Sequence, residues 1–116
     1  MSEYNPDKWS ILKFKGKEDT WYKVMGSWYG GYLDGDSWRL SSGLERIEES
    51  GEFYLMHNFS GSIYKCHKNM EGMNMTAAGV FETAKKEGAK NNVEVTAIDI
   101  DQFNKEKADE KELIKL

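Results

Sequence analysis

The segments of this sequence with the clearest β-strand pattern carry large apolar side chains on both faces, and this feature limits how the chain can fold. Side chains alternate across a strand. The two faces of the segment 20–29 carry, in turn, Tyr22, Val24 and Trp28, and Trp21, Met25 and Tyr29. An antiparallel sheet with one side in water has a polar face instead. The sheet therefore needs a cover on each side.

A predicted hairpin of the segments 52–58 and 62–68 has the same property. If "FSGS" is a four-residue loop, Asn58 pairs with Ile63 and Leu55 with Cys66. This register places Phe53, Leu55, Tyr64 and Cys66 on one face, and Tyr54, Met56 and Ile63 on the other. Large exposed apolar patches are rare on monomers. Three arrangements would cover the second face: a sheet that curls into a barrel-like shape, a second copy of the chain, or a ligand.

The whole pattern predicts an α+β fold in a single domain over residues 1–116. We expect an antiparallel meander of five to seven strands, curled if barrel-like closure provides the second cover. The predicted strands span 8–14, 20–29, 37–42, 44–50, 52–58, 62–68 and 92–98. Residues 1–7, which end near Pro6, are expected to form a flexible lead, and the glycine-rich segment 30–36 a mobile loop.

Two helices are predicted in the later part of the chain. One face of a helix over 75–87 carries Ala77, Val80, Phe81 and Ala84. We expect Asn74 or Thr76 to cap the start of this helix and Gly88 to end it. A charged helix is expected from residue 99 or 101 to about 112. The first helix can cover only one face of the sheet, and the second is too polar to cover the other.

Charge and cysteine content exclude several classes of function. The formal net charge of -4 is spread evenly, with nine basic and eleven acidic side chains in residues 1–72 and seven and nine in 73–116. Non-specific nucleic-acid binding is therefore not expected. Cys66 is the only cysteine, which excludes an intramolecular disulfide and a thiolate metal cluster. A polar start and the lack of a run of about 20 apolar residues predict a cytoplasmic protein without a membrane segment.

The chain lacks the residue patterns of common catalytic and metal sites. The segment 34–45 begins like a calcium loop, but Arg39 stands at its sixth position, where the sharp turn needs glycine. Cys66 and His67 are neighbours on a predicted strand and so face opposite ways, which rules out a dyad between them. Neither a P-loop nor a Gly-x-Ser-x-Gly motif occurs. We therefore predict a protein that is not an enzyme and holds no cofactor or metal.

Aromatic residues, glycines and one arginine are concentrated in "GSWYGGYLDGDSWRLSSG", residues 26–43. The rings can stack on a nucleotide base, and Arg39 can bind a phosphate group with two hydrogen bonds. The predicted ligand-binding residues are Trp28, Tyr29, Tyr32, Trp38, Arg39, Ser41, Ser60 and Lys65, with Ser42 and Ser62 as further donors. In the alternative interpretation the rings belong to the core, and Arg39 pairs with Glu45 or Glu52.

The stretches "SWYGGYLDGDSWRLSSG" and "NFSGSIYKCHK" resemble stretches of small uncharacterised proteins encoded by tailed bacteriophages. The resemblance covers about residues 9–80. It implies an accessory protein that counters host defence in an infected bacterium, by blocking a protein or by sequestering a nucleotide signal. Sponges of this kind are non-enzymatic and oligomeric, with pockets at subunit interfaces. No residue role carries over, because no shared pocket motif is found here.

Three functional hypotheses follow. The first is a non-catalytic binding protein, present as a homo-oligomer, that captures a small anionic ligand such as a nucleotide. The second is a protein–protein inhibitor or adaptor that binds a host protein through an exposed aromatic sheet face. The third is a small hydrolase, which has the least support because the catalytic patterns are missing.

Overall fold

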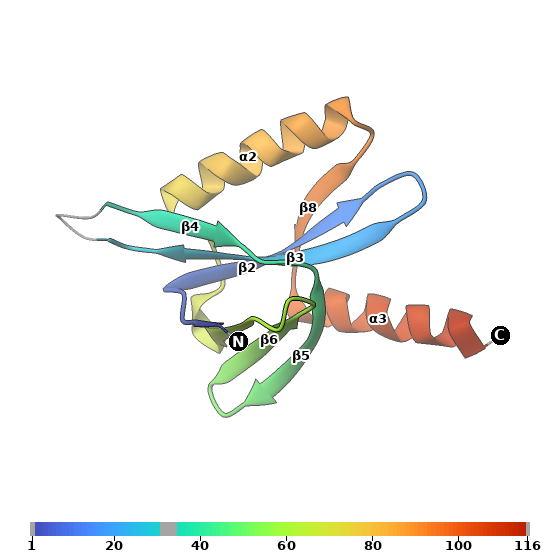
Figure 1. Ribbon diagram of the computed structural model, residues 1–116, viewed down its shortest axis with the longest axis horizontal. Helices are drawn as coiled ribbons and strands as arrows, with labels where there is room; N and C mark the ends of the chain where they lie inside the picture. The colour runs from blue at the N-terminus through green and yellow to red at the C-terminus, as the bar shows by residue number, and fades with distance from the viewer. Residues whose placement is uncertain (1, 31–34, 116) are drawn as a thin grey trace.

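The computed structural model describes residues 2–30 and 35–115, with side chains as far as Glu110 (Figure 1). The described strands are β1 (Glu3–Tyr4), β2 (Lys8–Lys15), β3 (Thr20–Trp28), β4 (Ser37–Leu40), β5 (Leu44–Ser50), β6 (Phe53–Asn58), β7 (Ile63–His67) and β8 (Glu94–Ile98). The helical segments are the short 3-10 helix η1 (Lys68–Met70), α2 (Met75–Lys90) and α3 (Ile100–Lys115). Sheet A has the strand order β1-β7-β6-β5, and sheet B has the order β4-β3-β2-β8. The predicted α+β class is confirmed, with the described strands in two mainly antiparallel sheets and no closed barrel.

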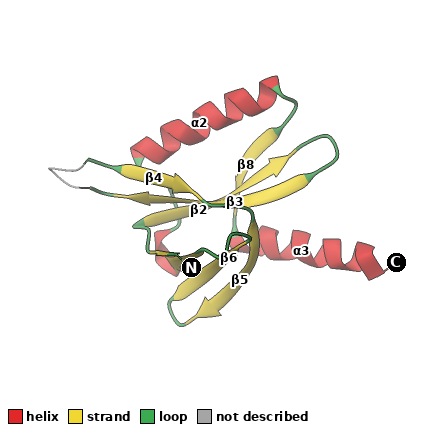
Figure 2. Ribbon diagram, in the orientation of Figure 1, coloured by secondary structure: helices red, strands yellow, loops and turns green. Residues whose placement is uncertain are grey.

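The inner faces of the two sheets pack against each other and form the main core. Its buried side chains are Trp9, Ile11, Tyr22, Val24, Leu44, Met56, Tyr64, Cys66, Ile98 and Phe103. On the outer face of sheet B, Leu12 and Met25 pack with Ala77 of α2. Figures 1 and 2 show α2 and the strands of sheet A on opposite sides of sheet B. The molecule therefore has three layers in the order α2, sheet B, sheet A.

This layering accounts for the two apolar faces of β3. Tyr22 and Val24 belong to the core between the sheets, and Met25 belongs to the core under α2. The inner face of sheet B is thus covered by sheet A of the same chain. We had expected a curled sheet, a second copy or a ligand to cover this face. The expectation of a homo-oligomer loses that support and stays a prediction.

The β6–β7 hairpin has a different register from the predicted one. His57 pairs with Ile63, where Asn58 was the predicted partner. Asn58 is the last residue of β6 and lies opposite Ser62 instead, because its main-chain N–H donates to the main-chain oxygen of Ser62 at 3.0 Å. A shift of one residue moves every side chain of one strand to the other face. The predicted faces are therefore wrong, and the inner face carries Tyr54, Met56, Tyr64 and Cys66.

The N-terminal residues form part of sheet A. Residues 3–4 form β1, which pairs in parallel with β7. The main-chain oxygen of Asn5 accepts a hydrogen bond of 3.0 Å from the indole of Trp28, and Pro6 is buried. The prediction of a flexible lead over 1–7 is corrected for these residues, because the edge of β7 and the Trp28 indole supply hydrogen-bond partners for the main chain.

Both helices begin at a predicted cap, but both end later than expected. The side-chain oxygen of Asn74 accepts a hydrogen bond of 2.8 Å from the N–H of Ala77 at the start of α2. Asp99 caps α3 in the same way, also at 2.8 Å. Gly88 does not end α2, which continues to Lys90. Within the described residues, no helix has the length and apolar character needed to cross a membrane.

Gly88 allows α2 to lie close to the chain that leads into β8. A Cβ atom at this position would lie 2.6 Å from the main-chain oxygen of Val93. Gly88→Ala is therefore expected to lower the free energy of unfolding by roughly 1–3 kcal/mol. Gly79, in the same helix, has open space around its Cβ position, so Gly79→Ala should raise it by roughly 0.5–1 kcal/mol. Urea denaturation of both variants measures the difference, and equal effects would contradict the close contact.

Glu106 attaches α3 to sheet B. Its carboxylate accepts hydrogen bonds from the Tyr22 hydroxyl at 2.6 Å and the Gln102 amide at 2.9 Å, and pairs with the Lys13 ammonium at 2.7 Å. Burial alone would raise the pKa of Glu106, but hydrogen bonds from these three side chains lower it below its ordinary value. The ionised form of Glu106 therefore stabilises the folded state.

Because the pKa of Glu106 is lower in the folded state than in the unfolded state, the free energy of unfolding depends on pH. Ionised Glu106 adds stability above its ordinary pKa, and this stability is lost as the pH falls through the folded value. Glu106→Gln should lower the free energy of unfolding at neutral pH by roughly 1–3 kcal/mol and flatten its decline in acid. Glu82→Gln removes only an exposed ion pair with Lys85 and should have an effect below about 1 kcal/mol. Denaturation midpoints across the acidic range measure this, and parallel curves for wild type and Glu106→Gln would refute it.

Candidate ligand-binding site

A polar pocket of about 390 Å³ lies where the edge strand β4 of sheet B approaches β1 and β7 of sheet A. Two loops complete it, the connection from β4 to β5 and the β6–β7 turn. Its lining residues are Ser2, Tyr4, Arg39, Leu40, Ser41, Ser42, Ser60, Ser62 and Tyr64. We call this the Arg39 pocket. It contains three of the predicted ligand-binding residues.

Arg39 is the only charged side chain among the described residues that line the pocket. It is exposed, and its guanidinium lies over the ring of Tyr4, with 4.5 Å between Cζ and the ring centroid. Across the β3–β4 pair Arg39 stands opposite Gly26, which brings no side chain to this position. The described residues offer Arg39 no salt-bridge partner, so the alternative pairing with Glu45 or Glu52 is not observed. Its charge therefore remains available to a ligand.

Serine hydroxyls form a connected row on the loop side of the pocket. The hydroxyl of Ser42 donates to that of Ser60 at 2.8 Å, and Ser60 donates to Ser62 at 3.1 Å. Ser41 is bonded to the main chain, since its hydroxyl accepts from the N–H of Val24 at 2.8 Å and donates to the oxygen of Ser42 at 2.6 Å. Hydroxyl protons can rotate to suit a new acceptor. Ser42, Ser60 and Ser62 are thus better placed than Ser41 to turn a donor toward a ligand.

Tyr64 lines the pocket from the core side. Its side chain is 1% exposed, and its ring lies 5.0 Å from that of Tyr4 between centroids. Its hydroxyl has no hydrogen-bond partner among the described residues. Burial raises the pKa of Tyr64, and the neighbouring Arg39 guanidinium opposes this rise only in part. The hydroxyl therefore keeps its proton at neutral pH and is an unused donor.

The predicted aromatic residues are not gathered around Arg39. Trp28 packs against the main core and donates its indole N–H to Asn5, whereas Tyr29 and Trp38 are 51% and 43% exposed. Trp38 and Arg39 are neighbours on β4, so their side chains point to opposite faces of sheet B. Tyr32, like most of the predicted mobile loop at 30–36, falls on residues 31–34, which lie outside the described residues.

Lys65 also lies away from the pocket. It belongs to the outer face of sheet A, where its ammonium is 4.5 Å from the centroid of the Phe53 ring. Tyr64 and Cys66 face the core, and Lys65 between them on β7 therefore faces outward. In the observed register it lies opposite Leu55 on that outer face. Of the predicted ligand-binding residues, the structure therefore brings together Arg39, Ser41 and Ser60, along with the further predicted donors Ser42 and Ser62.

The pocket residues that the sequence analysis did not identify are Ser2, Tyr4, Leu40 and Tyr64, of which the two tyrosines bring rings and hydroxyls. Tyr4 fell within the segment assigned to a flexible lead, and a two-residue strand has no periodicity that would reveal it. Tyr64 was assigned to a core face without reference to Arg39. The run of serines on both sides of Gly61 was the available signal, since it marked the β6–β7 turn as a source of hydroxyl donors.

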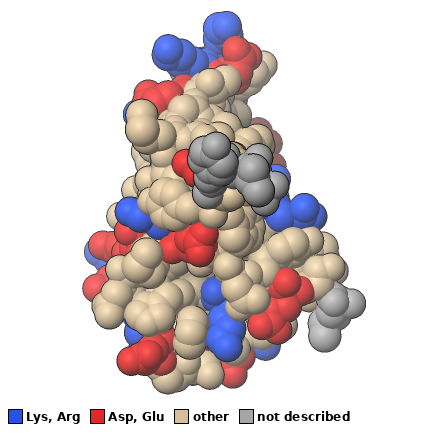
Figure 3. Space-filling model, turned by 90° about the vertical axis from the view of Figure 1, so that its left-hand side faces the viewer, with Lys and Arg blue, Asp and Glu red and all other residues tan. Residues whose placement is uncertain are grey.

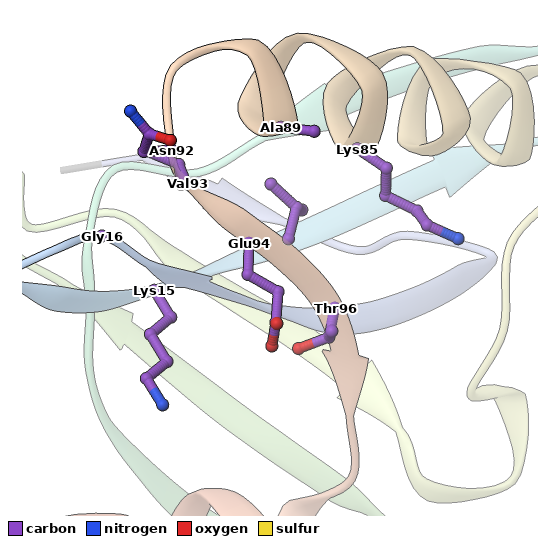
Figure 4. Close-up of a pocket in the computed structure, with 9 residues that line it drawn as sticks. Lys15, Gly16, Lys85, Ala89, Asn92, Val93, Glu94 and Thr96 are labelled. Carbon is purple, nitrogen blue, oxygen red and sulfur yellow. The ribbon is translucent and has the colours of Figure 1, made fainter.

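A larger groove of about 720 Å³ lies between the C-terminal half of α2, β8 and the end of β2 (Figure 4). Two lysines and one glutamate contribute charge, and the rest of the lining is Gly16, Ala89, Asn92, Val93, Val95 and Thr96. In Figure 4, Lys15 and Lys85 come from different elements and point in different directions. No unpartnered buried polar atom among the described residues lines this groove. Its lysines do not converge on one ligand position, so the smaller Arg39 pocket is the stronger candidate.

Cys66 is buried beside the Arg39 pocket and is not an activated nucleophile. Burial raises the pKa of its thiol well above the usual range. The thiol donates to the main-chain oxygen of Tyr64 at 3.6 Å. Within the described residues, no three His, Cys, Asp or Glu side chains lie together in a way that would hold a metal ion.

Acidic and basic side chains are mixed on the face shown in Figure 3, which looks onto the end of the molecule that carries the β3–β4 hairpin. A protein that binds nucleic acid through phosphates concentrates basic side chains on one surface. The face in Figure 3 shows no such concentration of basic side chains.

Comparisons with protein-family models, with curated proteins and with solved structures found no match for this chain. The resemblance to small phage proteins therefore stays a prediction.

Proposed function

We propose that this protein is a non-catalytic binding protein that captures a small anionic ligand, such as a nucleotide, in the Arg39 pocket. One observation carries the proposal: a guanidinium without a described salt-bridge partner lines a pocket whose other described side-chain polar groups are hydroxyls. Both kinds of group donate hydrogen bonds to anions. The described lining contains no acidic side chain that would repel a negative ligand.

Capture of a ligand requires affinity and no bond-breaking step, which suits a pocket without a base or nucleophile among its described residues. Its volume of about 390 Å³ is within the range of roughly 300–1,000 Å³ found for small-molecule sites. The proposal extends to the role that the phage resemblance implies, which is sequestration of a nucleotide signal in the host cytoplasm. The proposal also includes that the protein acts as a homo-oligomer.

Arg39→Ala tests the proposal. A ligand that binds only the folded state raises the melting temperature, and at 100 times its Kd it adds about 2.7 kcal/mol of stability. We expect at least one member of a panel of linear and cyclic nucleotides to raise the melting temperature of the wild type, and Arg39→Ala to abolish that rise. Arg46→Ala is the matched control, because Arg46 is an exposed arginine on β5 outside the pocket. A flat response of the wild type, or an unchanged response of Arg39→Ala, would remove the proposal.

The exposed rings favour a second candidate function, a protein–protein inhibitor or adaptor. Trp38 pairs with Ser27 near the end of β3, and Tyr29 follows directly after that strand, so the two exposed rings lie at the same end of the β3–β4 pair. Exposed tryptophan and tyrosine are common anchors in protein interfaces.

Trp38→Ser distinguishes this candidate from ligand capture. If a host protein binds here, the variant should lose a stoichiometric complex in size-exclusion chromatography and keep any nucleotide-induced rise in melting temperature. Trp21→Ser is the control, since Trp21 is 37% exposed but stacks on Phe14 at the other end of β3. Equal losses for the two variants would contradict a partner site at Trp38.

A further inference from the structure

We infer that the Arg39 pocket takes one phosphate group of a phosphate monoester, held by the Arg39 guanidinium, the Tyr64 hydroxyl and the serine hydroxyls of the β6–β7 turn. This inference rests on the proposed capture of an anion and narrows the ligand to a chemical class. Four observations lead to it: an unused donor, the directions of the donors, the charge of the lining and its volume.

The Tyr64 hydroxyl is the first observation. A buried polar group without a partner destabilises a protein, and native structures contain few of them. The side chain of Tyr64 is 1% exposed, and its hydroxyl has no partner among the described residues. Burial raises the pKa of Tyr64, which keeps the group protonated. Its neighbour Arg39 has donors only. Arg39 can donate toward the phenol oxygen but cannot accept the phenol proton. The missing partner is therefore an acceptor, and beside a guanidinium an anionic oxygen suits that position.

The directions of the donors favour a tetrahedral group over a planar one. Arg39 reaches the pocket from β4, Tyr64 from β7, and Ser60 from the turn between β6 and β7. A carboxylate is planar and can be satisfied by the two parallel hydrogen bonds of a single guanidinium. A phosphate group presents oxygens in three dimensions and can use donors from all three elements.

The charge of the lining limits how many phosphates the pocket can hold. Arg39 is the only charged side chain among the described lining residues, and the other side-chain donors are neutral hydroxyls. One guanidinium offsets about half to two-thirds of the charge of one phosphate monoester, which is about -1.5 to -2 at neutral pH. A triphosphate would bring several further negative charges without cations to balance them.

The volume agrees with this limit. At about 390 Å³ the pocket is near the lower end of the usual range for small-molecule sites, roughly 300–1,000 Å³. It has room for a phosphate and a compact organic group attached to it. A mononucleotide enters phosphate first, with its base toward the opening.

The test uses the full chain and four probes: inorganic phosphate, adenosine monophosphate, adenosine triphosphate and acetate. We expect the two monophosphates to bind in isothermal titration, acetate to bind at least 10-fold more weakly, and the triphosphate to gain nothing over the monophosphate. Tyr64→Phe removes only the unused donor. Loss of one hydrogen bond to a charged group should weaken the binding of both monophosphates to Tyr64→Phe by about 10- to 100-fold. The melting temperature of the ligand-free variant should equal or exceed that of the wild type, because an unsatisfied buried group is gone.

Tyr54→Phe is the matched control. Tyr54 lies on the neighbouring strand β6, faces the same core and is not part of the pocket lining. Its variant should bind both monophosphates as the wild type does. The comparison of the four probes on the wild type needs no variant, so the inference remains testable if Tyr64→Phe does not fold.

The outcomes separate this inference from the proposed function. If no probe binds, or if Arg39→Ala binds as the wild type does, both fail. If binding requires Arg39 but Tyr64→Phe keeps full affinity, the inference fails and anion capture stands. The same holds if acetate matches phosphate, or if the triphosphate binds 10-fold more tightly than the monophosphate.

Discussion

The packing of sheet A against sheet B is the interaction on which the rest of the structure depends. Ten buried side chains from both sheets and α3 share this core. Burial of apolar surface contributes about 25 cal/mol per Å², and large rings such as Trp9 and Tyr64 supply much of that surface in a chain of 116 residues. Because both sheets come from one chain, the second apolar face of sheet B becomes interior. The exposed groups that remain are confined to the edges and outer faces of the two sheets.

The Arg39 pocket results from how the sheets meet at one edge. Gly26 has no side chain, and a Cβ atom there would lie 3.1 Å from Pro6 and 3.3 Å from the Tyr64 ring. The main chain of β3 therefore lies close to the tyrosine, and Arg39, opposite Gly26, extends over Tyr4. A charged side chain from the edge strand β4, a buried hydroxyl from β7 and a serine turn meet here because the two sheets approach each other at this end. A sheet interior cannot provide such a group of donors, since its inward side chains are apolar.

Apart from the short β1 and η1, the sequence was sufficient to predict the elements of this fold but not the relations between them. Alternation predicted correctly which side chains of β3 share a face, and the helix caps at Asn74 and Asp99 followed from local chemistry. The hairpin register depended on whether the loop has three or four residues, and the hydrogen bond from Asn58 to Ser62 shows the shorter loop. Local pattern contains no information about that choice. The division of one meander into two packed sheets is likewise a long-range property.

For the candidate site, too, the sequence predicted individual residues but not which of them lie together. Arg39, Ser41 and Ser60 were identified by residue type, because an isolated arginine near hydroxyls is a common anion-binding pattern. Their separation from Trp38 follows from alternation along β4. Tyr4 required knowledge that a two-residue segment pairs in parallel with β7, some 60 positions away in the sequence. Contacts of this kind depend on the complete fold.

The position of β1 has a practical consequence for work with this protein. Ser2 lines the Arg39 pocket, and the next two residues are held by a single parallel pairing at the edge of sheet A. An affinity tag joined ahead of Ser2 would leave the molecule from the wall of the Arg39 pocket and bring its own charges and side chains there. Purification handles therefore belong after α3, at the opposite end of the chain, and a preparation tagged at the N-terminus reports on an altered pocket.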